Sequence, residues 1–283
     1  MNFETLKLRP EGNVLRVSLA ASPINLMSPQ MVGELFTVAG GLISDQNTRV
    51  VVLDSDLDEY FMAHFDLLAI IASVNDPESP QSQYPDINIL QGLITTWQSV
   101  PQVTVAKVNG ICRGAGLELI LGLDMRFASA DSTFGFPEAS GGFLACGGGT
   151  TRVLMSCGPA RGLEVLLSSR DFTGDEAERY GLVNRALPAS ELNTYVEDTV
   201  AHLAKRPLRI VALHKQVLRS VFKDMADAMF AGFGAENDGL RASLSRDDVL
   251  AVTRRVADEA QTPETEKDLP ALISRITSEI PLR

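Results

Sequence analysis

The sequence predicts an α/β fold, in which buried strands alternate with helices. Residues 49–53 (RVVVL) are a β-branched apolar run that is typical of a buried strand. Residues 103–108 form a second apolar strand, which leads through a Gly-rich turn into a helix that begins near Ala115. From residue 208 the sequence shows long helical patterns rich in Ala, Leu, Val and Met, so we expect helices to dominate the C-terminal part.

Turn and capping signals predict the other elements in order. Residues 3–8 and 14–19 are predicted as short strands around a turn at residues 10–13. Ser28 before Pro29 is typical of a helix start and predicts a helix to about residue 44. Residues 86–97 have apolar side chains at helical spacing, with Trp97 in the core. Further strands are predicted at residues 125–130, 132–136 and 183–187, and further helices at residues 152–168 (broken at Gly158-Pro159), 173–180, 192–205 and 208–233.

Composition and charge argue against some classes of binding partner and some locations in the cell. The net charge is −11 and no Lys/Arg cluster exists, which argues against nucleic acid and against an anionic membrane. The three cysteines have no metal-ligand spacing, and their odd number suits a reducing compartment. No apolar run reaches the roughly 18 residues of a membrane-spanning helix, and the N-terminal residues have no targeting pattern. We therefore expect a cytoplasmic protein.

Two glutamates form the strongest candidate site. Glu118 lies in the first turn of the helix that begins near Ala115, where unpaired backbone N–H groups attract negative charge. Glu138 follows Pro137 and precedes a Gly-rich stretch, and the predicted helix and short strand in between can bring it back beside Glu118. Two glutamates at such a spacing are also typical of a solvated surface. Beside helix-start donors, however, they indicate acid–base chemistry next to an oxyanion hole.

The residues around both glutamates resemble a known family. The string NGICRGAGLELILGLDMRFASADSTFGFPEASGG is similar to the signature region of the enoyl-CoA hydratase/isomerase (crotonase) superfamily. TRVVVLDSDLDEYFMAHFDL and GGGTTRVLMSCGPARGLEVLLSSRDFTGDEAERYGLVNRALP are similar to segments on either side of it, and the similarity extends from about Val14 to about Pro207. The resemblance implies a crotonase-like spiral of ββα units. Residues 1–206 would form this core with the active site, and residues 207–283 a C-terminal helical trimerisation region with a divergent tail.

The resemblance also implies roles for individual residues. The backbone N–H groups of Phe65 and Ala115 would hold a thioester oxygen, and Glu118 and Glu138 would carry out acid–base catalysis on water. Cys146 matches a position whose backbone N–H holds water in the family. The implied substrate-binding residues are Ala63, His64, Asp66, Gly114 and Cys146.

These roles predict an enzyme that adds water to a 2-enoyl-CoA thioester, a lyase of fatty acid metabolism. Coenzyme A enters as part of the small acyl-CoA substrate, no metal or other cofactor is expected, and the implied assembly is a homotrimer or a dimer of trimers. The presence of both glutamates favours a hydratase over an isomerase. A hydrolase or C–C lyase that uses His64, on a substrate with or without CoA, stays open as the alternative. A non-enzymatic binding protein is disfavoured, because it needs neither the carboxylates nor the donors.

Several positions depart from the family pattern. His64 stands where Gly is usual, and it could replace glycine conformationally or act as an acid, base or donor. Residues 20–24 and Leu68 lack basic side chains that usually contact CoA. Arg113 is expected to be exposed, and the polar loop at residues 75–85 is expected to shape the acyl pocket. No family contacts can be assigned beyond about residue 244.

Overall fold

The fold is built on two sheets. A computed structural model describes residues 3–74 and 87–282. The larger sheet contains, in spatial order, β1 (Leu6–Glu11), β2 (Val14–Leu19), β3 (Val50–Ser55), β5 (Val103–Val108), β7 (Met125–Ser129) and β10 (Arg185–Leu187). All neighbours in it run parallel except β1 and β2. The smaller sheet contains β4 (Tyr60–Met62), β6 (Ile111–Arg113), β8 (Thr133–Gly135) and β9 (Phe172–Thr173).

The chain alternates between these sheets in a repeating way. Strands β3, β5 and β7 lie in the larger sheet, and each is followed by a strand of the smaller one, β4, β6 or β8. The helices α2 (Leu67–Val74) and α4 (Ala115–Leu121) come directly after β4 and β6. Units of two strands and a helix therefore follow one another, as the predicted spiral of ββα units requires.

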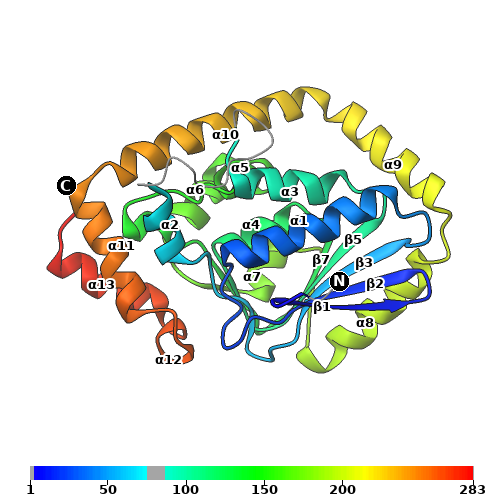
Figure 1. The fold of residues 1–283 in the computed structure, drawn as a ribbon, viewed down its shortest axis with the longest axis horizontal. Coiled ribbons are helices and arrows are strands. Elements are labelled where there is room, and N and C mark those ends of the chain that lie inside the picture. The colour runs from blue at the N-terminus through cyan, green and yellow to red at the C-terminus, as the bar shows by residue number, and fades with distance from the viewer. Residues whose placement is uncertain (1–2, 75–86, 283) are drawn as a thin grey trace.

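Helices cover the sheets and extend beyond them. Figure 1 shows α9 (Leu208–Val221) and α10 (Lys223–Leu244) as an arc along one long side of the molecule. It shows α11 (Asp247–Glu259), α12 (Pro263–Glu266) and α13 (Leu269–Glu279) gathered at the end away from the larger sheet. The remaining helical segments are α1 (Pro29–Ser44), α3 (Ile89–Ser99), the 3-10 turn η1 (Glu138–Gly141), α5 (Gly149–Cys157), α6 (Pro159–Leu167), α7 (Gly174–Tyr180) and α8 (Ala189–Leu203).

Local sequence explains the helices next to the site. The Ser28 hydroxyl accepts the N–H of Met31 at 3.2 Å, and Pro29 occupies the first turn, so α1 begins as predicted. Asn88 and Gln91 form a capping box at the start of α3, in which each side chain accepts a backbone N–H of the other. Trp97 on α3 is fully buried, which confirms its predicted place in the core.

Three expectations from the sequence are wrong. The strand predicted at residues 3–8 is β1, which extends to Glu11, so that the turn comprises only Gly12 and Asn13; Pro10 is tolerated in it because β1 is an edge strand. Arg113 is fully buried instead of exposed, because its guanidinium makes two 2.7 Å bonds to the Asp171 carboxylate and a third to the carbonyl oxygen of Glu266. It belongs to β6, a strand that the sequence did not predict because three residues between glycines carry no strand pattern. The single helix predicted for residues 208–233 is two helices that meet at Phe222, and the second extends to Leu244.

The tail folds against the rest of the chain. Buried side chains of α11 and α13 form an apolar cluster with Leu67 of α2, and Ile70 and Phe143 pack against it. The expected role of residues 75–85 in shaping the acyl pocket lies outside the described residues and stays a prediction. Within the described residues no helix combines the length and apolar character needed to cross a membrane.

Candidate active site

A cavity of about 320 Å³ lies where the two glutamates meet. Phe65, Ala115, Glu118, Glu138 and Cys146, five of the residues singled out in the sequence, line it. Most of its other lining side chains are apolar and come from α1, α2, α3 and α10 and from the loop before α5, among them Val32, Ile70, Leu90, Leu144 and Leu240. The cavity is therefore an apolar pocket with two carboxylates at one place in its wall.

Two backbone N–H groups at this cavity are unpaired. Met27 donates its N–H to the carbonyl oxygen of His64, and its own carbonyl oxygen accepts the N–H of Asp66. The N–H of Phe65, which lies between these two residues in the chain, therefore points away from Met27. Ala115 is the first residue of α4, whose first internal bond runs from Glu118 N–H to Gly114 C=O. Within the described part of the chain, neither Phe65 nor Ala115 donates its N–H to another residue. Both groups can therefore receive a developing negative charge on a ligand oxygen.

Glu118 is buried and held by the Gly-rich loop. Its Oε1 accepts the N–H groups of Gly147 and Gly149 at 2.7 and 2.8 Å. Burial raises the pKa of Glu118 to about 8, with a further rise from the negative charges of Glu138 and Glu236, and these effects outweigh the two N–H donors. A carboxyl group that is protonated near neutral pH can donate its proton from Oε2 while Oε1 accepts both N–H bonds.

Glu138 begins η1 and is only partly buried as a residue, but its Oε2 is shielded from solvent. Within the described residues this oxygen has no hydrogen-bond partner. Burial raises the pKa of Glu138 to about 7, while its own backbone N–H and the charge of His64 act in the opposite direction. Two carboxyl groups with raised pKa values therefore face one cavity.

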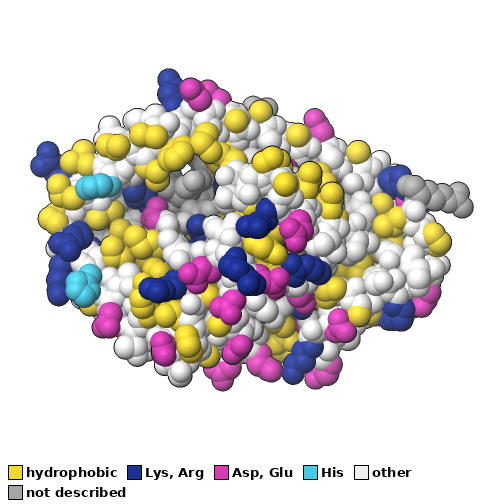
Figure 2. Space-filling model, turned by 180° about the vertical axis from the view of Figure 1, so that it is seen from behind, with side chains coloured by type: hydrophobic (Ala, Val, Ile, Leu, Met, Phe, Trp, Pro, Cys, Tyr) yellow, Lys and Arg dark blue, Asp and Glu magenta, His cyan; other side chains and the backbone are white. Residues whose placement is uncertain are grey.

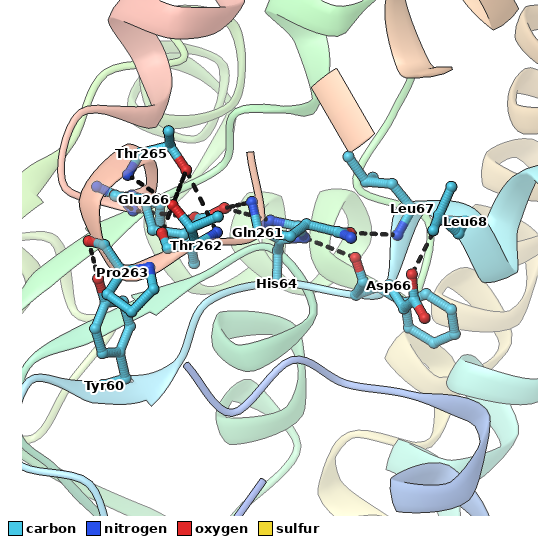
Figure 3. Close-up of polar contacts among 12 residues, drawn as sticks. Tyr60, His64, Asp66, Leu67, Leu68, Gln261, Thr262, Pro263, Thr265 and Glu266 are labelled. Atoms are coloured by element: carbon cyan, nitrogen blue, oxygen red, sulfur yellow. Dashed lines mark hydrogen bonds and ion pairs between the residues drawn. The ribbon is translucent and has the colours of Figure 1, made fainter. Parts of the chain in front are cut away.

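His64 lies behind the cavity wall instead of in it. Its ring is buried, Nδ1 is 2.6 Å from the carbonyl oxygen of Phe65, and Nε2 is 3.0 Å from Oε1 of Glu266. Figure 3 shows the segment from Gln261 to Glu266 alongside the segment from Tyr60 to Leu68, with contacts joining them. The His64 ring lines a second, small cavity of about 50 Å³, which Glu138 also lines.

The other residues singled out in the sequence matter mainly through their backbone atoms. Ala63 and Asp66 donate their N–H groups to Ile24 and Met27, and the Asp66 carboxylate accepts the N–H of Leu68. Gly114 has a φ of +46°, and a Cβ there would lie 2.7 Å from Glu138 Oε1, so only glycine fits. Ala63, Asp66 and Gly114 are not among the residues that line the main cavity. Their roles in binding, like those of the residues that do line it, stay predictions.

The sequence did not point to Glu236, which the structure places behind the site. This carboxylate on α10 is buried and accepts hydrogen bonds from the N–H groups of Gly148 and Thr151 and from Gln91 Nε2. It therefore fixes the same loop that holds Glu118, from the opposite side. One of several acidic residues in a helix gives no signal of such a role, because 85 or more residues separate Glu236 from the loop groups that it binds.

Comparisons with known proteins agree with this geometry. The model of the family described as enoyl-CoA hydratase/isomerase matches residues 9–249. A carnitinyl-CoA dehydratase of Proteus mirabilis is 28% identical over 221 residues, which cover 77% of this chain and 81% of that protein. A crystal structure from Streptomyces avermitilis, of a provisionally named enoyl-CoA hydratase, superposes with a TM-score of 0.89 at 32% identity, covering 98% of this chain and all of the other. The enoyl-CoA hydratase of Bacillus halodurans shares the fold, with a TM-score of 0.77 at 19% identity over 87% of this chain and 98% of that one.

The raised pKa of Glu118 predicts that the free energy of unfolding decreases as pH rises. Unfolded Glu118 loses its proton near its ordinary pKa of 4.5, whereas the folded protein keeps it to about pH 8. The folded state therefore binds more protons in this window, and its stability falls as pH rises. We expect Glu118→Gln to gain at least about 1 kcal/mol in free energy of unfolding, relative to wild type, between pH 5 and pH 8.5. Urea denaturation at several pH values measures this gain.

Glu34→Gln is the matched control. Hydrogen bonds from Glu4, Thr5 and Gln30 outweigh burial and lower the pKa of Glu34, so its contribution is present above its unfolded pKa and is lost only as pH falls below that value. Its substitution should change stability by the same amount at pH 5 and pH 8.5. A pH-independent effect of Glu118→Gln would contradict the raised pKa.

Proposed function

The chain belongs to the enoyl-CoA hydratase/isomerase family, and we propose that it adds water across the double bond of a 2-enoyl-CoA thioester. The observation that carries this proposal is that two buried carboxyl groups and two unpaired backbone N–H groups meet at one apolar cavity. The apolar walls suit an acyl chain, and the polar groups suit a thioester and a water molecule at its end. Coenzyme A would enter as part of the substrate, and the chemistry derived below uses no metal or other cofactor.

The proposed reaction follows from the positions of these groups. The N–H groups of Phe65 and Ala115 would bind the thioester oxygen, where negative charge develops as water attacks the β-carbon. Glu118 and Glu138 would hold the water between them, and one of the two groups would take a proton from it as the water oxygen bonds to that carbon. The other group would donate a proton to the α-carbon, which balances the addition. Each oxyanion donor typically contributes about 3–4 kcal/mol to such a transition state.

The name of one relative supports a reaction of this type. The Proteus protein is named a carnitinyl-CoA dehydratase, and a dehydration is the reverse of a hydration. Because the walls of this cavity are largely apolar, we favour an uncharged acyl chain as the substrate here. The acyl group would then be recognised by shape and burial, and fatty acid metabolism is the setting that we propose.

The placement of His64 supports a hydratase over the alternatives that use this histidine. Both ring nitrogens are engaged, by Phe65 and Glu266, and the ring does not line the main cavity. A hydrolase or C–C lyase in which His64 acts on the substrate would need the ring to leave both partners. The presence of two carboxyl groups at the cavity supports hydration over isomerisation, for which one is enough.

The first test is the loss of one carboxyl group. Glu138→Gln keeps the size of the side chain but cannot accept the proton of water, so we expect hydration of crotonyl-CoA to fall by about 10²–10⁴-fold. The decrease in absorbance of the conjugated thioester measures the rate. Glu164→Gln, at an exposed position on α6, is the control and should leave the rate unchanged. Undiminished turnover by Glu138→Gln would exclude the proposed mechanism.

We also propose that the protein acts in the cytoplasm and assembles as a homotrimer or a dimer of trimers. Support comes from apolar side chains of α9 and α10 that the described residues leave exposed. Figure 1 draws α9 at the upper right. In Figure 2, which is turned by 180° about the vertical axis, hydrophobic side chains gather at the upper left, on the side of this helix. Exposed side chains recur at helical spacing along α9, which suits packing against a second copy: Ile210, Leu213, Val217 and Val221.

The proposed assembly predicts that a charged side chain on α9 separates the subunits. Val217 is 61% exposed in the single chain, so Val217→Asp should leave each subunit folded but place a buried charge in the interface. We expect the mass of the Val217→Asp protein in solution, measured by light scattering after size exclusion, to fall toward that of one subunit. Ser190→Asp on α8 is the control and should keep the mass of the wild type. A wild-type protein of monomer mass would overturn the proposed assembly.

A further inference from the structure

A third buried carboxylate, Glu236 of α10, lies behind the active site, and the proposed hydration does not use it. Only 2% of this residue is exposed. Its Oε1 accepts the N–H and the hydroxyl of Thr151 at 2.7 and 2.6 Å. Its Oε2 accepts the N–H of Gly148 at 2.9 Å and Nε2 of Gln91 at 3.0 Å. Four donors, from α3, from α5 and from the loop before α5, therefore converge on one carboxylate.

These donors require an anion at this position. Backbone N–H groups and an amide nitrogen can only donate, so a neutral carboxyl group or an amide in place of the carboxylate would leave one of them without an acceptor. Arg152 supplies a positive charge nearby, with its guanidinium 4.8 Å from the centre of the Phe233 ring. Burial lowers the pKa of Arg152 to about 10, and the charge of Glu236 acts against this effect. The surroundings of Glu236 therefore suit an ionised side chain that accepts hydrogen bonds from the loop.

The loop between Glu236 and Glu118 presents its N–H groups alternately to the two side chains. Gly148 donates to Glu236. Its neighbours Gly147 and Gly149 donate to Oε1 of Glu118, at 2.7 and 2.8 Å. Gly148 has a φ of +97°, a conformation that other residues rarely adopt. The direction of the middle N–H therefore determines the direction of the two that reach Glu118.

Helix α3 holds the start of the same loop. The carbonyl oxygen of Cys146 accepts Nδ2 of Asn88 at 2.7 Å and Nε2 of Gln91 at 2.9 Å. Because Gln91 also donates to Glu236, α3, α10 and the loop share one network of hydrogen bonds. The loop cannot shift without breaking bonds to both helices.

The face of α10 that carries Glu236 also forms part of the cavity wall. Leu240 and Leu244 line the cavity, and they follow Glu236 at intervals of four residues on this helix. A displacement of α10 would therefore change the site for the acyl chain as well as the loop. A loss of the hydrogen bonds of Glu236 would change the loop alone.

We propose that Glu236 is a positioning residue that acts on Glu118 through the loop at residues 147–149. The inference rests on the proposed hydration, in which Glu118 and Glu138 hold the water. With Oε1 of Glu118 fixed by two N–H groups, Oε2 remains for this water, because within the described residues it has no hydrogen-bond partner and it is not shielded from the cavity. Glu236 is not among the described residues that line the cavity, so it acts without touching the substrate.

The first test is Glu236→Gln in the hydration of crotonyl-CoA. The amide cannot accept from all four donors, so the loop should shift and kcat should fall about 10–100-fold. KM should stay near its wild-type value, because the wall on α10 is unchanged. Glu34→Gln is the matched control and should leave kcat unchanged, since Glu34 also accepts two N–H groups, a Thr hydroxyl and a Gln amide, but on α1.

Two further variants test whether Glu236 acts through Glu118. In a Glu118→Gln background, Glu236→Gln should lower kcat no further, because the group that it positions is gone. Glu236→Asp keeps the charge but is one carbon shorter, so it cannot bind Gly148 and Thr151 together and should lower kcat as well; it also serves if Glu236→Gln does not fold. Wild-type activity of Glu236→Asp, or an undiminished further loss in the Glu118→Gln background, would overturn the inference.

Hydrogen exchange separates this inference from the proposed function. Measured by mass spectrometry, residues 147–149 should exchange at least about fivefold faster in Glu236→Gln than in wild type. Residues 103–108 of β5 should exchange alike in Glu236→Gln and Glu34→Gln. Faster exchange of the loop in a protein that does not hydrate thioesters would refute the function alone. A loop that exchanges at the wild-type rate in both Glu236→Gln and Glu236→Asp would overturn the positioning role.

Discussion

The burial of two carboxyl groups at one cavity is the constraint on which the rest of this site depends. Glu118 and Glu138 face the same space, and burial raises both pKa values into the range of about 7 to 8. Two adjacent anions in a dry pocket are unfavourable, so near neutral pH one proton is held between them. The same pair can then act as acid and base without any other titratable group.

The surroundings of each carboxyl group decide how this proton is distributed. The negative charges of Glu138 and Glu236 both act on Glu118, which also accepts the N–H groups of Gly147 and Gly149. Glu138 instead borders Gly114, as His64 does. Because the two carboxyl groups differ in their nearest neighbours, they are not equivalent.

The sequence predicted the parts of this arrangement that depend on neighbours along the chain. Ser28-Pro29 starts α1, residues 103–108 form β5 with those bounds, and α4 begins at Ala115, which brings Glu118 to the first turn. The resemblance to a family then indicated which backbone N–H groups and which carboxylates to expect in the active site. These features depend on local capping, periodicity and motif spacing, which a single sequence contains.

The remaining parts depend on residues that are far apart in the chain. Arg113 appeared to be a surface residue because its partners, Asp171 and the carbonyl of Glu266, lie 58 and 153 residues away. The partner of His64 lies in a tail without a recognised motif, and Glu236 reaches the active-site loop from α10. No local pattern distinguishes a buried carboxylate of this kind from a solvated one, so its role became visible only in the fold.

Infrared difference spectroscopy tests the central claim, the sharing of one proton, most directly. A protonated, buried carboxyl group absorbs separately from ionised carboxylates. At pH 7 we expect the wild-type protein to show one such absorption, and we expect Glu118→Gln to remove it while Glu164→Gln leaves it in place. An absorption that is absent from the wild type, or that survives in Glu118→Gln, would contradict the assignment of the proton to Glu118.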